Sequence, residues 1–262
     1  MKLSISNIAW SSDNDSKMLA YLKNAEFTGL EIAPTRIFSE LPYEKLAQAA
    51  QFADMLKQRY QLEISSMQSI WFGRVERIFG TEEERLTLVN YTQKAIDFAV
   101  EIGCKNLVFG CPKNRISGSD GDMAIAVSFF HKLGEYALKK GTVLSIEPNP
   151  VLYGTNFINR TPQAFGLVKQ VDCEGFRVNV DFGTILYNQE TLAPIEDNLH
   201  LVNHVHISEP GLIPVEKRSQ HKELANILRR GNYQKFVSIE MKNTENIELV
   251  QETITYIKEV FM

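Results

Sequence analysis

The chain alternates short strand-like runs with longer helical segments, and this alternation continues along its whole length. Each strand-like run is rich in β-branched and aromatic residues, and apolar residues in the segment that follows recur every three or four positions. Eight such runs are present, at residues 3–8, 29–33, 62–67, 106–109, 142–147, 176–181, 202–207 and 236–240. Because strands that alternate with helices run in the same direction, the pattern predicts a parallel sheet.

Three of the helical segments carry recognisable signals. Thr81, with Glu84 three residues later, has the pattern of a reciprocal capping box at a helix start. An apolar face over residues 42–60 predicts one helix there. The last helix is expected to begin at a Thr244 cap, with Glu245 near the positive end of the helix dipole. Its apolar stripe consists of Ile247, Val250, Ile254, Ile257 and Phe261.

Eight strand–helix units in 262 residues match the size and the repeat of the (β/α)8 TIM barrel, an α/β fold. A doubly wound open sheet is the main alternative, but its GxGxxG phosphate-binding fingerprint is absent from the sequence. No Pro-, Gly- or Ser-rich linker marks a domain boundary. We therefore predict a single TIM-barrel domain over residues 1–262, with its functional site at the carboxyl ends of the strands.

Composition excludes several classes of protein. Hydrophobic residues make up 44% of the chain and charged residues 23%, which is typical of a globular domain. The 28 basic and 32 acidic residues give a net charge of −4, so nucleic acid is not an expected partner. No apolar run reaches the 18 residues of a membrane span, and the three cysteines lack CxxC spacing. We expect a soluble, cytoplasmic protein with reduced thiols.

Four of the strand-like runs end in polar residues two positions apart. Side chains alternate between the two faces of a strand, so each pair lies on one face. The residues inside the pairs are apolar and are expected to pack against helices, which leaves the polar side chains facing the barrel lumen. The pairs are Ser145 and Glu147, Asn179 and Asp181, His204 and His206, and Ser238 and Glu240.

Carboxylates on adjacent strands would repel one another and would lose their hydration unless a positive group lay among them. Any one of these carboxylates alone would be explained equally well by a structural ion pair. Four ligand-type residues at neighbouring strand ends favour a divalent cation instead. We expect Glu147, Asp181, His206 and Glu240 to bind Mn²⁺ or Mg²⁺, with Co²⁺ and Zn²⁺ as alternatives. One carboxylate would remain free to act as a general base.

The sequence resembles the xylose isomerase-like TIM barrel superfamily, which includes sugar phosphate isomerases and epimerases, ketose 3-epimerases and endonuclease IV. The resemblance covers nearly the whole chain and rests on residues 145–148, 180–181, 204–209 and 238–241. It implies a metal-dependent sugar isomerase or epimerase of carbohydrate metabolism that removes a proton next to a carbonyl through a metal-stabilised enediolate. Glu147 and Glu240 would be the acid/base pair, Mn²⁺ the metal, and a homo-oligomer the expected assembly.

The chain departs from the superfamily pattern at several positions. Ketose 3-epimerases place a substrate-binding His three residues after the metal-binding Asp, where this chain has Thr184. They place a Glu six residues after the first catalytic Glu, where this chain has Tyr153. Endonuclease IV has additional histidines where this chain has Gln68, Cys111 and Thr184. DNA repair is therefore not the expected activity.

Seven residues are candidates for substrate binding. Lys113 and Arg115 follow the fourth strand and offer cations for a phosphate or a carboxylate, although a solvated loop would explain them equally well. Arg218 and His221 belong to a segment that would close over the mouth of the barrel. His204 lies one layer deeper and is expected to support its neighbours. The complete set is Gln68, Lys113, Arg115, Tyr153, His204, Arg218 and His221.

Three functions remain open at this point. The first is the sugar, sugar phosphate or sugar acid isomerase or epimerase. The second is a non-catalytic member that binds a carbohydrate or another metabolite. The third is a lyase or dehydratase that uses the same metal and the same base.

Overall fold

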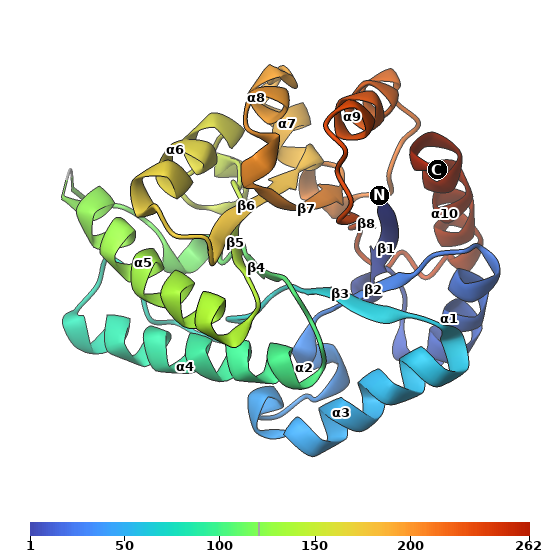
Figure 1. The fold of residues 1–262 in the computed structure, drawn as a ribbon, viewed down its shortest axis with the longest axis horizontal. Coiled ribbons are helices and arrows are strands. Elements are labelled where there is room, and N and C mark those ends of the chain that lie inside the picture. The colour runs from blue at the N-terminus through green and yellow to red at the C-terminus, as the bar shows by residue number, and fades with distance from the viewer. Residues whose placement is uncertain (120) are drawn as a thin grey trace.

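Eight parallel strands close into one barrel in the order in which they occur along the chain (Figure 1). The computed structural model describes residues 1–119 and 121–262. The strands are β1 (Lys2–Ser6), β2 (Gly29–Ile32), β3 (Glu63–Met67), β4 (Leu107–Phe109), β5 (Leu144–Ile146), β6 (Phe176–Asp181), β7 (Val202–Ile207) and β8 (Phe236–Ile239). The predicted (β/α)8 fold is confirmed, and closure between β1 and β8 excludes the open-sheet alternative.

Helices surround the barrel and connect successive strands (Figure 1). They are α1 (Asp15–Asn24), α2 (Pro34–Ile37), α3 (Leu46–Met55), α4 (Glu82–Glu101), α5 (Asp122–Lys140), α6 (Thr161–Val171), α7 (Phe182–Asn188), α8 (Ala193–Asp197), α9 (Ser219–Arg230) and α10 (Ile247–Phe261). Short 3-10 turns follow several strands. No helix in residues 1–119 or 121–262 has the length and apolar character needed to cross a bilayer.

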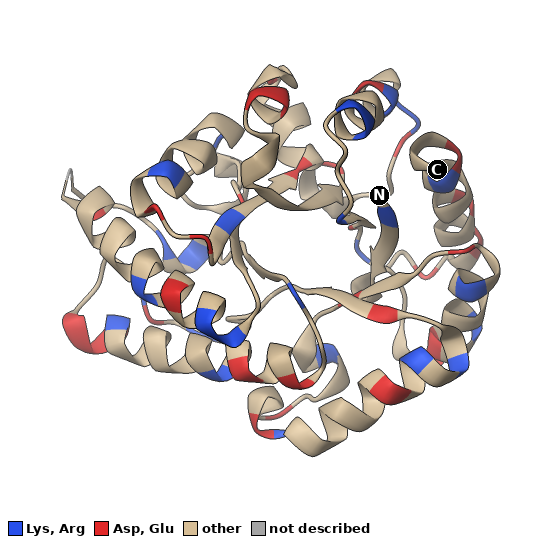
Figure 2. Ribbon diagram, viewed as in Figure 1, with Lys and Arg blue, Asp and Glu red and all other residues tan. Residues whose placement is uncertain are grey.

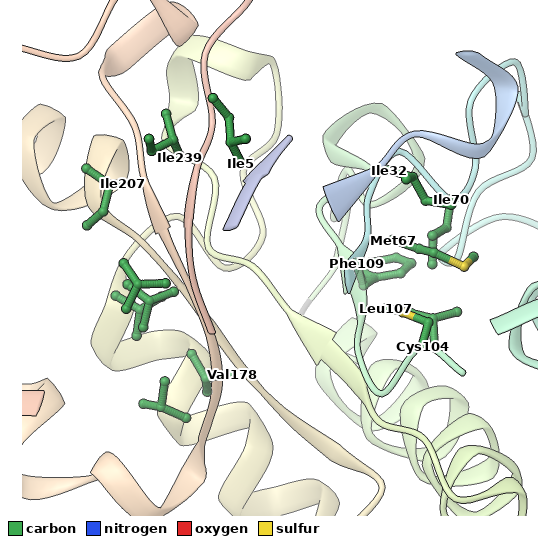
Figure 3. Packing of buried hydrophobic residues seen from close by; sticks show 14 of the residues in the cluster. Ile5, Ile32, Met67, Ile70, Cys104, Leu107, Phe109, Val178, Ile207 and Ile239 are labelled. Carbon is green, nitrogen blue, oxygen red and sulfur yellow. The ribbon is translucent and has the colours of Figure 1, made fainter. Parts of the chain in front are cut away.

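The apolar core lies between the strands and the helices. The outward residues of the strand-end pairs, Ile146, Val180, Val205 and Ile239, are completely buried, as expected. Figure 3 shows Ile5, Ile207 and Ile239 grouped on one side of the barrel, and Met67, Leu107 and Phe109 on another. This layer holds the strand ends in fixed positions, because close-packed side chains resist displacement.

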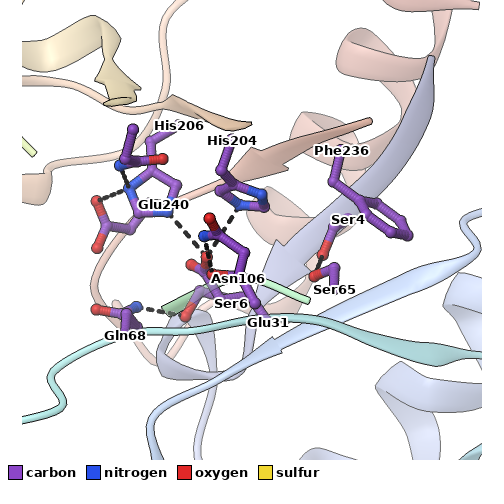
Figure 4. Close-up of polar contacts among 12 residues, drawn as sticks. Ser4, Ser6, Glu31, Ser65, Gln68, Asn106, His204, His206, Phe236 and Glu240 are labelled. Atoms are coloured by element: carbon purple, nitrogen blue, oxygen red, sulfur yellow. Dashed lines mark hydrogen bonds and ion pairs between the residues drawn. The ribbon is translucent and has the colours of Figure 1, made fainter. Parts of the chain in front are cut away.

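The lumen of the barrel is filled with polar side chains that bond to one another across the strands. Asn106 donates a hydrogen bond from Nδ2 to Ser66 Oγ at 2.9 Å, and its Oδ1 accepts from Ser145 Oγ and from Asn203 Nδ2. Ser4 and Ser65 are joined at 2.5 Å (Figure 4). Buried polar groups need such partners, so these contacts specify the alignment of the strands below the site.

Charged side chains of both signs are interspersed on the outer helices (Figure 2). Several form ion pairs on the exposed surface, such as Lys94 with Glu44 at 3.0 Å and Arg230 with Glu196 at 2.7 Å. Exposed pairs of this kind contribute little to stability. These surface ion pairs therefore do not determine how the barrel is arranged.

The helix expected over residues 42–60 is interrupted. A 3-10 turn at Pro42–Glu44 precedes α3, and the chain continues into a π-helical turn at Leu56–Tyr60. Leu41 adopts a left-handed conformation with φ of 46°, and the Tyr43 hydroxyl donates to the carbonyl of Ile70 at 2.7 Å. The prediction of one continuous helix was wrong because this contact with the loop after β3 replaces the first helical turn.

The two predicted helix starts have different outcomes. The capping box of α4 is confirmed, since Thr81 Oγ1 accepts from the Glu84 amide and Glu84 Oε2 accepts from the Thr81 amide. The predicted Thr244 cap of α10 was wrong. Asn246 Oδ1 accepts from the Leu249 amide at 3.0 Å and caps the helix instead.

Replacement of Asn246 by Ala is expected to destabilise the protein by about 1 kcal/mol, because an N-terminal amide of α10 loses its acceptor. The matched change Thr244→Ala should alter the free energy of unfolding by less than about 0.5 kcal/mol. Urea unfolding of both variants measures the difference. Equal losses in the two variants would show that Asn246 does not stabilise the start of α10.

Candidate metal centre

Four side chains converge at the carboxyl ends of β5 to β8. Glu147, Asp181, His206 and Glu240 each place one ligand-type atom within 4.8 Å of the others, and all four are buried. Asp181 and His206 belong to strands, whereas Glu147 and Glu240 directly follow strands. The backbones of the two glutamates remain fixed, because their amides donate to Phe109 and Ile207 on the neighbouring strands. The structure therefore brings together the four residues expected to bind a metal.

His206 lies at the centre of this cluster (Figure 4). Its Nδ1 is 2.9 Å from Glu147 Oε1 and 3.1 Å from Glu240 Oε2. Its Nε2 is 2.9 Å from Glu31 Oε2 on the opposite side of the ring. Nδ1 is therefore the nitrogen available to a ligand shared with the carboxylates, and Nε2 is held by Glu31.

Glu31 is a member of this polar cluster that sequence reasoning missed. It lies in β2, is fully buried, and also contacts His204 Nε2 at 3.1 Å. The other site residues were found as polar pairs two positions apart, but the residue two positions before Glu31 is Gly29. The available signal was a carboxylate inside a strand that is otherwise apolar, next to Leu30 and Ile32.

The charge state of this contact follows from its surroundings. Burial by itself would raise the pKa of Glu31, but the charge of His206 and the contacts with His204 and His206 lower it below its ordinary value. Burial by itself would lower the pKa of His206, but Glu31 and Glu240 raise it well above its ordinary value. Without a metal, His206 is therefore an imidazolium paired with carboxylates.

The remaining carboxylates hold protons more tightly than usual. Burial and the nearby charge of Glu147 raise the pKa of Asp181 to about 6, although Ser208 and Thr184 donate to it. Burial raises the pKa of Glu240 to about 7. Binding of a cation in place of these protons is therefore favourable for the buried carboxylates. Three carboxylates and one imidazole form a donor set that fits a divalent cation such as Mn²⁺ or Mg²⁺, with Glu31 orienting the imidazole.

A cavity of about 180 Å³ opens directly above the cluster. Its lining comes mainly from the loops that follow β3, β4, β5 and β7. Two of the predicted substrate residues, Gln68 and Tyr153, belong to this lining. The lining residues are Gln68, Ser69, Val108, Gly110, Cys111, Pro112, Glu147, Asn149, Tyr153, Asp181, Leu212 and Glu240.

Tyr153 and Gln68 are held in place by neighbouring loops. The Tyr153 hydroxyl accepts a hydrogen bond from the Gly211 amide at 2.9 Å. Burial and the nearby Asp181 raise the pKa of Tyr153, so the hydroxyl stays protonated and can donate a hydrogen bond to a ligand. Gln68 Nε2 donates to Ser6 Oγ at 2.6 Å. Both side chains present fixed polar groups to the cavity.

The other five predicted substrate residues are not brought to the cavity. Lys113 lies on the exposed surface, and His204 is buried behind the cluster against Glu31. Arg218 makes a bidentate pair with Glu209, which holds it in the loop after β7. His221 is buried in α9, where its Nδ1 contacts the Tyr256 hydroxyl.

Arg115, the fifth of these residues, is completely buried behind the cavity wall. Its Nη2 donates to the Glu147 carbonyl and to Asn149 Oδ1, and burial lowers its pKa to about 10. Within residues 1–119 and 121–262, no Lys or Arg lines the cavity.

The closed barrel and the acidic cluster at the carboxyl ends of its strands define a (β/α)8 barrel of the TIM type. The model of the xylose isomerase-like TIM barrel family matches residues 19–260. The chain therefore belongs to this family, as the motifs at the strand ends indicate.

Solved structures with this fold include several sugar-converting enzymes. 3-Keto-D-glucoside 4-epimerase from E. coli is 21% identical, with a TM-score of 0.79 and 99% of each chain covered. D-Psicose 3-epimerase from Clostridium cellulolyticum H10, solved with D-tagatose, is 16% identical, with a TM-score of 0.80 and 100% of this chain and 99% of the other covered. The probable 3-DHS dehydratase from Bacillus anthracis is 15% identical, with a TM-score of 0.73, covering 99% and 98%. At these identities, the likeness establishes the fold. No curated protein sequence matches this chain.

Replacement of Glu31 by Gln is expected to weaken Mn²⁺ binding by about 10- to 100-fold, because the carboxylate that orients His206 is lost. The matched control is Glu63→Gln, since Glu63 lies on the neighbouring strand and pairs with Lys2 on the exposed surface. Calorimetric titration of the metal-free proteins with Mn²⁺ gives both affinities. An unchanged affinity in Glu31→Gln would contradict the assigned role.

The stabilisation by metal is expected to increase with pH. The folded protein retains protons on Asp181 and Glu240 up to pH values near 6 and 7, whereas the unfolded chain releases them near 4. These two groups therefore make the metal-free protein less stable as pH rises through this window, and a cation removes that cost. Calorimetric melting at pH 5.5 and pH 8, with and without Mn²⁺, should show the larger metal-induced rise in Tm at pH 8. An equal or smaller rise at pH 8 would contradict the expectation.

Proposed function

We propose that the protein is a divalent-metal-dependent sugar epimerase or isomerase. The observation that supports this proposal most directly is the arrangement of Glu147 and Glu240. Their carboxylates approach the same nitrogen of His206, at 2.9 and 3.1 Å, and both residues line the same cavity. A sugar held in that cavity would have one carboxylate on each side of the carbon that exchanges its proton.

The chemistry requires removal of a proton from a carbon next to a carbonyl. Glu147, Asp181, His206 and Glu240 would hold the metal, which supplies a Lewis acid for the substrate oxygen. Glu147 then acts as the base on one face of the carbon. Glu240 would donate the returning proton on the other face of the carbon. Return of the proton from the opposite side inverts the carbon.

The substrate we favour is an uncharged keto-sugar. The cavity lining offers amides and hydroxyls from Gln68, Ser69, Asn149 and Tyr153, and three carboxylates from the cluster. A phosphate group would need a cationic partner. Arg115 is turned away from the cavity, and Arg218 is already paired with Glu209. Among the described residues, the cavity lining therefore has no Lys or Arg to pair with the added negative charge of a sugar phosphate.

Solvent exchange tests this function directly. The Mn²⁺-loaded protein is incubated in D2O with keto-sugars, keto-glycosides and their phosphorylated counterparts, and the products are examined by NMR. We expect deuterium at one carbon of an uncharged sugar together with inversion of that carbon. Glu147→Gln and Glu240→Gln should each lower kcat by about 10²- to 10⁴-fold, whereas Glu63→Gln should leave it unchanged.

Other outcomes of the same experiment would overturn the proposal. Loss of water with deuterium exchange but without inversion would identify a dehydratase or lyase. Binding of metal and sugar without any exchange would identify a non-catalytic sugar-binding member of the family. Turnover of phosphorylated sugars in preference to uncharged sugars would contradict the assigned substrate class.

A further inference from the structure

Arg115, in the loop that follows β4, is a cation buried in the interior of the protein. Its guanidinium is fully buried, and no carboxylate in residues 1–119 or 121–262 forms an ion pair with it. Its Nη2 donates to the Glu147 carbonyl at 2.8 Å and to Asn149 Oδ1 at 2.6 Å. Among the described residues, 1–119 and 121–262, its Nε and Nη1 have no hydrogen-bond partner. Burial of an unpaired charge costs free energy, so the two contacts that the Arg115 guanidinium does make must account for its position.

Asn149 connects this guanidinium to the carboxylate of Glu147. Its Nδ2 donates to Glu147 Oε2 at 2.8 Å. A guanidinium can only donate hydrogen bonds, so it requires the amide oxygen of Asn149 on its own side. The amide nitrogen must then point toward Glu147. Arg115 thereby selects the one orientation of the Asn149 amide that attracts the carboxylate, since the reversed amide would place two oxygens together.

The surrounding loop keeps this chain of contacts rigid. The backbone N–H of Asn149 donates to the Ile158 carbonyl at 3.1 Å, and Asn159 Nδ2 donates to the backbone carbonyl of Asn149 at 2.8 Å. Thr155 Oγ1 donates to the carbonyl of Arg115 at 3.1 Å. The segments that carry Arg115 and Asn149 are therefore tied to one another as well as to Glu147.

The two oxygens of Glu147 have different surroundings. Oε1 faces the cluster, where Asn179 Nδ2 donates to it at 2.7 Å and His206 Nδ1 lies at 2.9 Å. Oε2 is on the side of the cavity wall, since a Cβ added to the lining residue Gly110 would lie 2.9 Å from it. Asn149 is therefore the hydrogen-bond donor that fixes Oε2, the oxygen beside the wall of the cavity.

We propose that Arg115 and Asn149 are positioning residues that hold Glu147 Oε2 in the orientation needed for proton abstraction. Arg115 acts through Asn149 and through the Glu147 carbonyl, and it does not touch the substrate. The catalytic part of this inference rests on the proposed epimerase or isomerase function. The geometric part concerns only the orientation of the Glu147 side chain.

The test compares Arg115→Met, Asn149→Ala and the double variant with the wild-type protein. Each single change should lower kcat by about 10- to 100-fold, with KM for the sugar within about threefold of the wild-type value. The double variant should be no slower than the slower single variant, because both changes break the same chain of contacts. Arg115→Lys should recover part of the loss, since an ammonium can donate to Asn149 Oδ1.

A matched control is Arg177→Gln. Arg177 also donates to backbone carbonyls, those of Cys173 and Phe176, but it lies at the amino-terminal end of the barrel. This variant should keep the wild-type kcat. Multiplied losses in the double variant would show that Arg115 and Asn149 act independently. A raised KM with unchanged kcat in Arg115→Met would indicate direct substrate binding. Either result would overturn the proposal.

Crystal structures separate this inference from the proposed function. If the wild-type protein shows neither metal binding nor exchange, the proposed function fails, and kinetics no longer apply. The structure of Arg115→Met should still show a turned or displaced Asn149 amide and loss of its contact with Glu147 Oε2. An unmoved Glu147 carboxylate in that structure would overturn the positioning role whatever the activity.

Discussion

Mutual repulsion among buried carboxylates is the constraint on which the rest of the structure depends. Glu147, Asp181 and Glu240 lie together around one imidazole, and Glu31 contacts the same ring from behind. Such carboxylates stay close in a low-dielectric interior where a positive group lies among them and the backbone prevents their separation. The closed barrel provides that restraint from two sides. Apolar side chains pack the strands against the helices, and hydrogen bonds in the lumen hold their alignment.

The fold was predictable from the sequence because its signals are local and repeated. All eight strands were expected, and the capping box of α4 is present. The errors lie where a distant contact overrides the local pattern. Tyr43 bonds to a loop from another unit and interrupts the helix expected over residues 42–60. The start of α10 moved by two residues because Asn246 and Thr244 are both acceptable caps, and local sequence does not choose between them.

The site was predictable where strand periodicity fixes the direction of a side chain. The alternation of faces placed Asp181, His206 and the two glutamates correctly in one cluster. Arg115 was expected in the cavity, but it belongs to a loop, and a long flexible side chain there has no periodicity to direct it. Glu31 was missed because its neighbour two positions earlier is a glycine. Asn149 was missed because its role depends on contacts with residues far apart in the sequence.

The position of the cavity wall on the loops affects how the sequence of such a protein can change during evolution. The four residues of the acidic cluster belong to strands or directly follow them, whereas Ser69, Asn149, Tyr153 and Leu212 come from connecting loops. Loops tolerate replacement and changes in length, but strands inside a closed barrel do not. The loop side of the cavity can therefore vary in sequence and length while the cluster at the strand ends keeps its place in the barrel. Structures with only 14–21% identity can accordingly share one architecture with this chain and act on different molecules.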